Sequence, residues 1–173
     1  MNLLVAAAGI VSMTTAYQRG DLDETARQGA LAGPVVVEKA LASKVRATQL
    51  AAIVAAPAVE DRAELLPALV RIAAGPDRRV AVPAARAALV IATDLATHEL
   101  ADDLAPDDVQ TWRAAFEDVA RGATHPIEIR LLALDTCHAL AHVLDPAALG
   151  FDLDAAMKDP DPAIRAVARA LSR

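Results

Sequence analysis

Aromatic residues are scarce in this chain. One Trp, one Tyr and two Phe make up 2% of its 173 residues, whereas hydrophobic residues make up 55%. A core without large aromatic anchors has to be built from many small contacts between closely spaced elements. The apolar content is mostly Ala, Leu and Val, and Ala and Leu lead the helix-propensity scale. Gly is also sparse, with seven residues, so we expect an all-α fold.

Cysteine and lysine are nearly absent as well. The single Cys137 excludes an intramolecular disulfide and a cysteine-based zinc site, and we predict it to be a buried thiol. The chain has a net charge of −6 and no cluster of its few lysines, so nucleic acid is not an expected partner. No glycine-rich phosphate loop and no Gly-x-Ser-x-Gly elbow occurs in the sequence. We therefore expect a non-enzymatic protein without a cofactor.

The N-terminal segment, residues 1–20, has two interpretations. Its apolar run over residues 3–13 is shorter than the roughly 20 residues that cross a bilayer, and we expect no membrane partner. It fits a helix that caps the core of a cytoplasmic protein. It also has the length of a signal-peptide core, with small residues at 14–16 as a cleavage context. If residues 1–16 are a signal peptide, the protein is exported.

Residues 21–173 are expected to form one domain of successive helices. Asp21 is placed to cap the first helix, Gly33-Pro34 breaks it, and Asp61 is placed to open another. Asp107 or Asp108 is expected to cap the helix that follows the acidic connection over residues 98–106. The expected helices cover 21–32, 35–42, 45–56, 61–72, 80–95, 109–119, 129–144, 152–157 and 163–171.

A repeat appears when the first core residue of every second helix is aligned. These β-branched residues are Val45, Val80, Ile129 and Ile164, at intervals of 35, 49 and 35 residues. The middle interval is longer because it contains the acidic connection. The position after each is Arg46, Ala81, Arg130 and Arg165. Self-similarity at such a period is the signature of a helical solenoid.

The repeated pattern resembles HEAT repeats, in particular the short bacterial form related to phycobilin lyases. The resemblance covers residues 21–173. It is strongest in DPDPAIRAVARAL and weaker in GPDRRVAVPAARAAL, THPIEIRLLAL and SKVRATQLAAI. It implies an α-α superhelix of about four antiparallel helix pairs, in which Asp and Arg tie successive turns together. The matching positions are Asp77, Asp161, Arg46, Arg130 and Arg165, and Ala81 departs from the pattern.

The resemblance also implies that the second helices line a concave groove. On a helical wheel of residues 129–144, the apolar stripe is Ile129, Leu132, Ala133, Thr136, Leu140 and Val143. The opposite face, which would point into the groove, carries Leu131, Asp135, His138 and His142. Equivalent faces of earlier repeats add Val54, Val82, Arg86 and Leu89. Apolar residues ringed by polar ones predict a partner site.

The spacing of His138 and His142 places two imidazoles on one side of a helix, with Asp135 three residues earlier. A divalent metal is one interpretation. The other is a solvated polar ridge, which we favour, so no metal is expected.

These observations predict a scaffold that binds a protein or peptide through its groove. Two alternatives stay open: an enzyme or enzyme accessory of the HEAT-like lyase type, and a fragment of a longer HEAT array. The last helix carries an apolar face on which no later repeat would pack, which predicts self-association through that end. That face consists of Ile164, Val167, Ala168 and Leu171.

Overall fold

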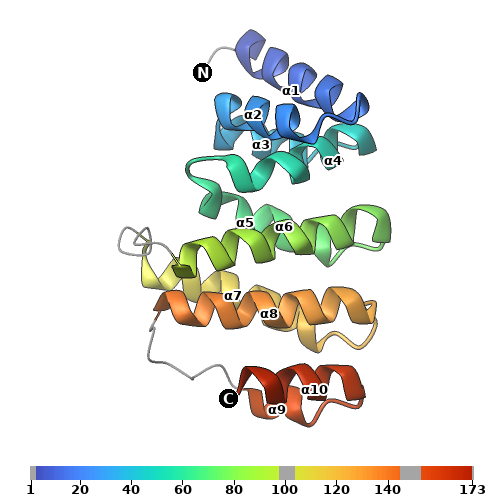
Figure 1. Ribbon diagram of the computed structural model, residues 1–173, viewed down its shortest axis with the longest axis vertical. Coiled ribbons are helices and arrows are strands. Elements are labelled where there is room, and N and C mark those ends of the chain that lie inside the picture. Colours follow the sequence, from blue (N-terminus) through green and yellow to red (C-terminus); the bar gives the residue numbers. More distant parts are fainter. Residues whose placement is uncertain (1–2, 98–103, 145–152, 173) are drawn as a thin grey trace. The chain divides into compact units, whose positions relative to one another are not determined.

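The computed structural model describes residues 3–97, 104–144 and 153–172 (Figure 1). These residues form ten α-helices and two short 3-10 helices, and no strand occurs among them. The prediction of an all-α fold is confirmed. Contacts divide the chain into two compact units, Met1–Ile91 and Ala92–Arg173, and each is described by itself.

The first unit contains α1 and the helices that follow it as far as the first part of α6. Its helices are α1 (Leu3–Gln18), α2 (Leu22–Ala32), α3 (Pro34–Leu41), α4 (Arg46–Ala55), α5 (Leu66–Ala73) and α6 (Arg78–Thr97, within this unit to Ile91). The 3-10 helices η1 (Ala56–Ala58) and η2 (Arg62–Leu65) connect α4 to α5. Helix α1 packs along α2 and α4, and α3 packs on α4. Residues 3–18 therefore form part of the first unit.

Small side chains let the helices of the first unit approach closely. Helices α2 and α4 meet at Gly29, where an added Cβ would lie 2.3 Å from the Cβ of Ala55. Ala51, Ala52 and Ala55 of α4 are fully buried. Larger side chains fill the remaining space of this core, among them Met13, Leu41, Ile53, Leu65, Leu66 and Leu69.

Helix starts in the first unit follow local sequence signals. The Asp21 carboxylate accepts a hydrogen bond from the Glu24 N–H at 2.9 Å, which caps α2 as predicted. Gly33 has a φ of +81°, a conformation that glycine adopts at little cost, and Pro34 follows as the first residue of α3. The helix expected from Asp61 begins later as an α-helix. Since Pro67 has no N–H and is tolerated only in a first turn, α5 starts at Leu66.

The second unit contains the last part of α6 and two helix pairs. Helices α7 (Pro106–Arg121) and α8 (Ile127–Leu144) pack on each other, and α10 (Pro162–Leu171) packs on α8 and on α9 (Leu153–Met157). The prediction that Asp107 or Asp108 caps α7 is wrong. Pro106 occupies the first helical position and Ala105 is the N-cap, which leaves both aspartates inside the first turn.

Helix α8 is buried on more sides than its apolar stripe predicts. Leu134, Cys137 and Ala141 lie outside that stripe and are buried, whereas Leu132 and Val143 are only half-buried. The reason is that α8 packs against both α7 and α10. On α10, Ile164 and Ala168 are buried, and Val167 and Leu171 are half-buried.

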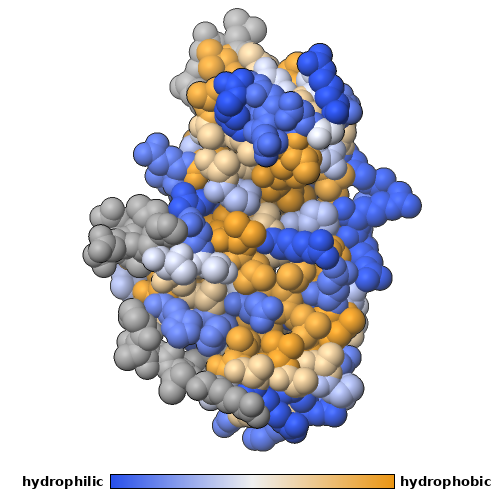
Figure 2. Space-filling view, viewed as in Figure 1, coloured by the Kyte–Doolittle hydropathy of each residue, from blue (hydrophilic) through white to orange (hydrophobic). Residues whose placement is uncertain are grey.

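Helix α6 is long and apolar enough to cross a membrane, by length and composition alone. Half of its apolar 18-residue stretch is buried inside the protein, as in a core helix. The surface shows hydrophobic residues interspersed with hydrophilic ones (Figure 2). The exposed large hydrophobic residues include Val5, Val11, Leu22, Leu31, Val35, Val45, Val90 and Ile127.

Candidate functional site

The predicted groove residues fall into two sets, one in each unit. Val82, Arg86 and Leu89 share one side of α6 in the first unit, and Val54 lies on α4. Arg86 is exposed, and the three apolar residues are half-buried. The other four predicted residues lie on α8 in the second unit. Their joint role as one concave groove stays a prediction.

On α8, two of the predicted residues come into direct contact. The Nε2 atoms of His138 and His142 lie 3.2 Å apart, and the two rings meet edge to face with centroids 4.6 Å apart. Partial burial, and then the neighbouring His142, lower the pKa of His138. Burial raises the pKa of Asp135, which is also half-buried. Within the described ranges, no group of three His, Cys, Asp or Glu is arranged to hold a metal ion.

The arginines of the repeat form similar links in the two units. Arg46 donates to the Asp77 carboxylate at 2.9 Å, and Arg130 pairs with Asp159. Each link runs from the start of one second helix to the turn before the next. Asp77 and Asp161 both accept a backbone N–H at the start of their helices, from Arg79 and Ala163. In the second unit Asp159, rather than Asp161, accepts the arginine.

Arg165 also stabilises the turn that precedes α10. Its guanidinium donates to the carbonyl oxygens of Asp159 at 2.7 Å and Pro160 at 2.8 Å. Arg130 in turn donates through Nε to the Ala120 carbonyl at 2.8 Å, which ties α8 to the end of α7. Arg130 and Arg165 therefore satisfy carbonyl groups at helix ends and turns, where backbone acceptors lack intrahelical partners.

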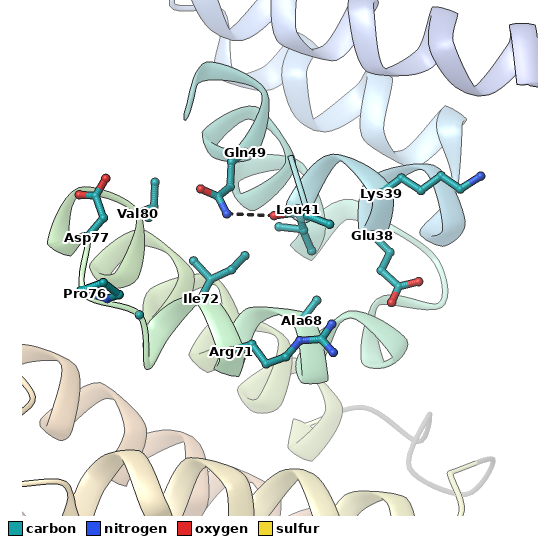
Figure 3. Close-up of a pocket in the computed structure, with 12 residues that line it drawn as sticks. Glu38, Lys39, Leu41, Gln49, Ala68, Arg71, Ile72, Pro76, Asp77 and Val80 are labelled. Carbon is teal, nitrogen blue, oxygen red and sulfur yellow. Dashed lines mark hydrogen bonds between the residues drawn. The ribbon is translucent and has the colours of Figure 1, made fainter. Parts of the chain in front are cut away.

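An open cavity of about 620 Å³ lies within the first unit. Helices α3 and α4 form one side, and α5 with the start of α6 forms the other (Figure 3). Its accessible apolar surface comes from Ala42, Ile72 and Pro76, and the buried Leu41, Ala68 and Val80 lie beneath. Leu41 is held in place by its neighbours, since Gln49 donates a hydrogen bond to the Leu41 carbonyl at 2.9 Å. We call this cavity the α3–α5 groove.

Charged side chains surround the α3–α5 groove. Glu38 and Lys39 line it from α3, and Arg71 lines it from α5. All three are exposed. Asp77 lies at the far end and is engaged by Arg46. Because Arg71 has no hydrogen bond or ion pair within the described part of the chain, its guanidinium can take a carboxylate from a ligand.

None of the eight predicted groove residues lines the α3–α5 groove. Ile72, at the end of the helix expected over residues 61–72, is half-buried and lies at this groove. One sequence signal could have pointed to this groove. Gln49 is a long polar residue followed by an apolar stretch, LAAIVA, and such a residue needs a hydrogen-bond partner at a helix surface or end.

Comparison of the chain with protein-family models, with curated proteins and with solved structures finds no match. The similarity to HEAT repeats therefore rests on the sequence pattern alone.

Proposed function

We propose that this chain is a non-enzymatic binding scaffold, built as a HEAT-like solenoid of helix pairs that presents a groove to a protein or peptide. The equivalent arginine links of Arg46 and Arg130 support the repeat, since these residues occupy the same repeat position, two repeats apart, and perform similar structural tasks. The observation that carries the binding function is the α3–α5 groove, an apolar floor with a charged rim.

The size and lining of the α3–α5 groove favour a short peptide segment as ligand. Its volume of about 620 Å³ lies within the range of ligand-binding clefts, and its floor is aliphatic. An aliphatic side chain of the partner would lie against Ala42 and Ile72. A carboxylate beside it would pair with Arg71, a residue type suited to binding carboxylates. The preferred partner is thus a segment in which a Leu, Ile or Val adjoins an Asp or Glu.

The test is selection of peptides from a random library on the folded protein. Enriched peptides should combine an aliphatic and an acidic residue, and NMR titration should shift the signals of Leu41, Gln49 and Ile72. Arg71→Glu should weaken binding by at least tenfold, because it places a second carboxylate against that of the peptide. Arg71 is exposed, so the variant should keep the native fold.

Arg169→Glu is the matched control. Arg169 is an exposed arginine on α10 and does not line the α3–α5 groove. Its charge reversal changes the net charge equally and should leave peptide affinity unchanged. Selected peptides that bind both variants as tightly as the wild type, or that shift no groove signal, would refute the proposed function.

A further inference from the structure

The two histidines of α8 adopt a geometry that a solvated ridge does not require. They are four residues apart on one helix, and both are half-buried. Each ring presents its Nε2 atom to the other at 3.2 Å, with the rings 88° apart. Both Nε2 atoms therefore lie within reach of a single ion beside the helix.

We propose that His138 and His142 together bind one divalent first-row transition-metal ion through their Nε2 atoms. Metal–imidazole bonds to Zn²⁺ are about 2.0–2.1 Å long. With ligand atoms 3.2 Å apart, such bonds enclose an angle of about 100° at the metal. That angle lies between the octahedral and tetrahedral values, so the separation of the two Nε2 atoms fits chelation of one ion.

The contact between the two rings already brings the ligand atoms together without an ion. Without an ion, a close Nε2–Nε2 contact is favourable only while one ring donates a hydrogen and the other accepts it. An ion replaces that single hydrogen bond with two coordinate bonds.

The donor set selects the class of ion. Two imidazole nitrogens suit Cu²⁺, Ni²⁺ and Zn²⁺, whereas Mg²⁺ and Ca²⁺ prefer oxygen ligands. Asp135 lies one turn earlier on α8 but does not complete a three-residue ligand group. The remaining coordination positions would be filled by water or by a ligand atom from another molecule. The inference is independent of the α3–α5 groove, which lies in the other unit.

The experiment uses the full chain without a polyhistidine tag, titrated with Zn²⁺, Ni²⁺ and Cu²⁺ by calorimetry and followed by NMR of the histidine side chains. We expect one equivalent to bind, with Cu²⁺ bound most tightly, and the Nε2 signals of His138 and His142 to shift together. Mg²⁺ and Ca²⁺ should leave both signals unchanged. An unshifted histidine pair at millimolar Zn²⁺ and Ni²⁺ would overturn the proposal.

Histidine variants identify the residues that bind the ion. His138→Gln and His142→Gln should each lower the affinity by at least tenfold, because a single imidazole remains. His125→Gln is the matched control, since His125 lies in the turn between α7 and α8 and should not affect binding. Equal affinity in all three variants would place the ion elsewhere and refute the pair. If a variant unfolds, the wild-type NMR titration still decides.

Discussion

At the scale of single residues, the two arginine–aspartate links differ mainly in burial. The side chains of Arg130 and Asp159 are 6% and 12% exposed, whereas those of Arg46 and Asp77 are 53% and 41% exposed. A charge left without its partner in a buried site is costly, but an exposed one is solvated by water. The same repeat position therefore contributes very differently to stability in the two units.

The buried link gives a direct prediction. Asp159→Asn leaves the Arg130 guanidinium buried without its counter-charge, and we expect the free energy of unfolding to fall by about 3–5 kcal/mol. Urea unfolding followed by circular dichroism measures this loss. Arg46→Met, which breaks the exposed link, is the control and should cost far less. Equal losses of unfolding free energy in the two variants would contradict the conclusion that burial makes the Arg130–Asp159 pair the more important one.

Asp77 combines capping with ion pairing, and a pH titration separates the two. Its pKa is lowered first by the backbone N–H of Arg79 and then by Arg46. A carboxyl with a lowered pKa stabilises the folded state at pH values above its unfolded pKa of about 3.9, and this contribution is lost as the pH falls through the folded pKa. In Arg46→Met we expect the pKa of Asp77 to rise only part of the way to that value.

The carboxyl signal of Asp77 and the amide signal of Arg79 report this titration by NMR. Both should titrate together in the wild type and in Arg46→Met, since the capping hydrogen bond remains. A complete return of the Asp77 pKa to its ordinary value in that variant would mean that the arginine, not the cap, dominates.

At the scale of helices, close packing depends on where glycine allows it. Gly29 lies within α2, where alanine would ordinarily favour the helix by about 1 kcal/mol. Here its added Cβ would meet the Cβ of Ala55 at 2.3 Å and the Cα at 3.3 Å. The clash involves backbone as well as side chain, so α2 and α4 would have to separate.

We therefore expect Gly29→Ala to lower the free energy of unfolding by about 1–3 kcal/mol, as overpacked cores do. Adding Ala55→Gly removes the facing Cβ and should restore much of this loss. Thermal unfolding of the two single variants and the double variant gives the coupling energy. Independent, additive effects would show that the two helices do not meet at these residues.

The helix starts and the α3–α5 groove differ in how far they could be predicted from the sequence. Helix starts at Asp21, Pro34 and Asp161 were predictable because capping and proline geometry are local. The start of α7 was missed since two local signals compete there, and Pro106 prevails over the aspartates. The α3–α5 groove was not predictable, because it depends on how helices far apart in sequence pack.

At the scale of the whole molecule, the chain consists of two compact units with links of the same kind in each. If the helix pairs form a quasi-one-dimensional array, stability is the sum of local terms and nearest-neighbour interfaces. A destabilising substitution in one helix pair then lowers the stability of that pair and its neighbours, while the amides of distant pairs stay protected from hydrogen exchange. Asp159→Asn is such a substitution, since Asp159 lies between α9 and α10.

In this variant we expect amide hydrogen exchange to accelerate most in α9 and α10, by roughly a hundredfold or more, because each 1.4 kcal/mol corresponds to a factor of ten. Exchange in α7 and α8 should accelerate less, and exchange in α1 to α4 should not change. Exchange measured by mass spectrometry on the full chain resolves these segments. Uniform acceleration from α1 to α10 would show that the two units unfold as one cooperative body, and it would count against a modular array.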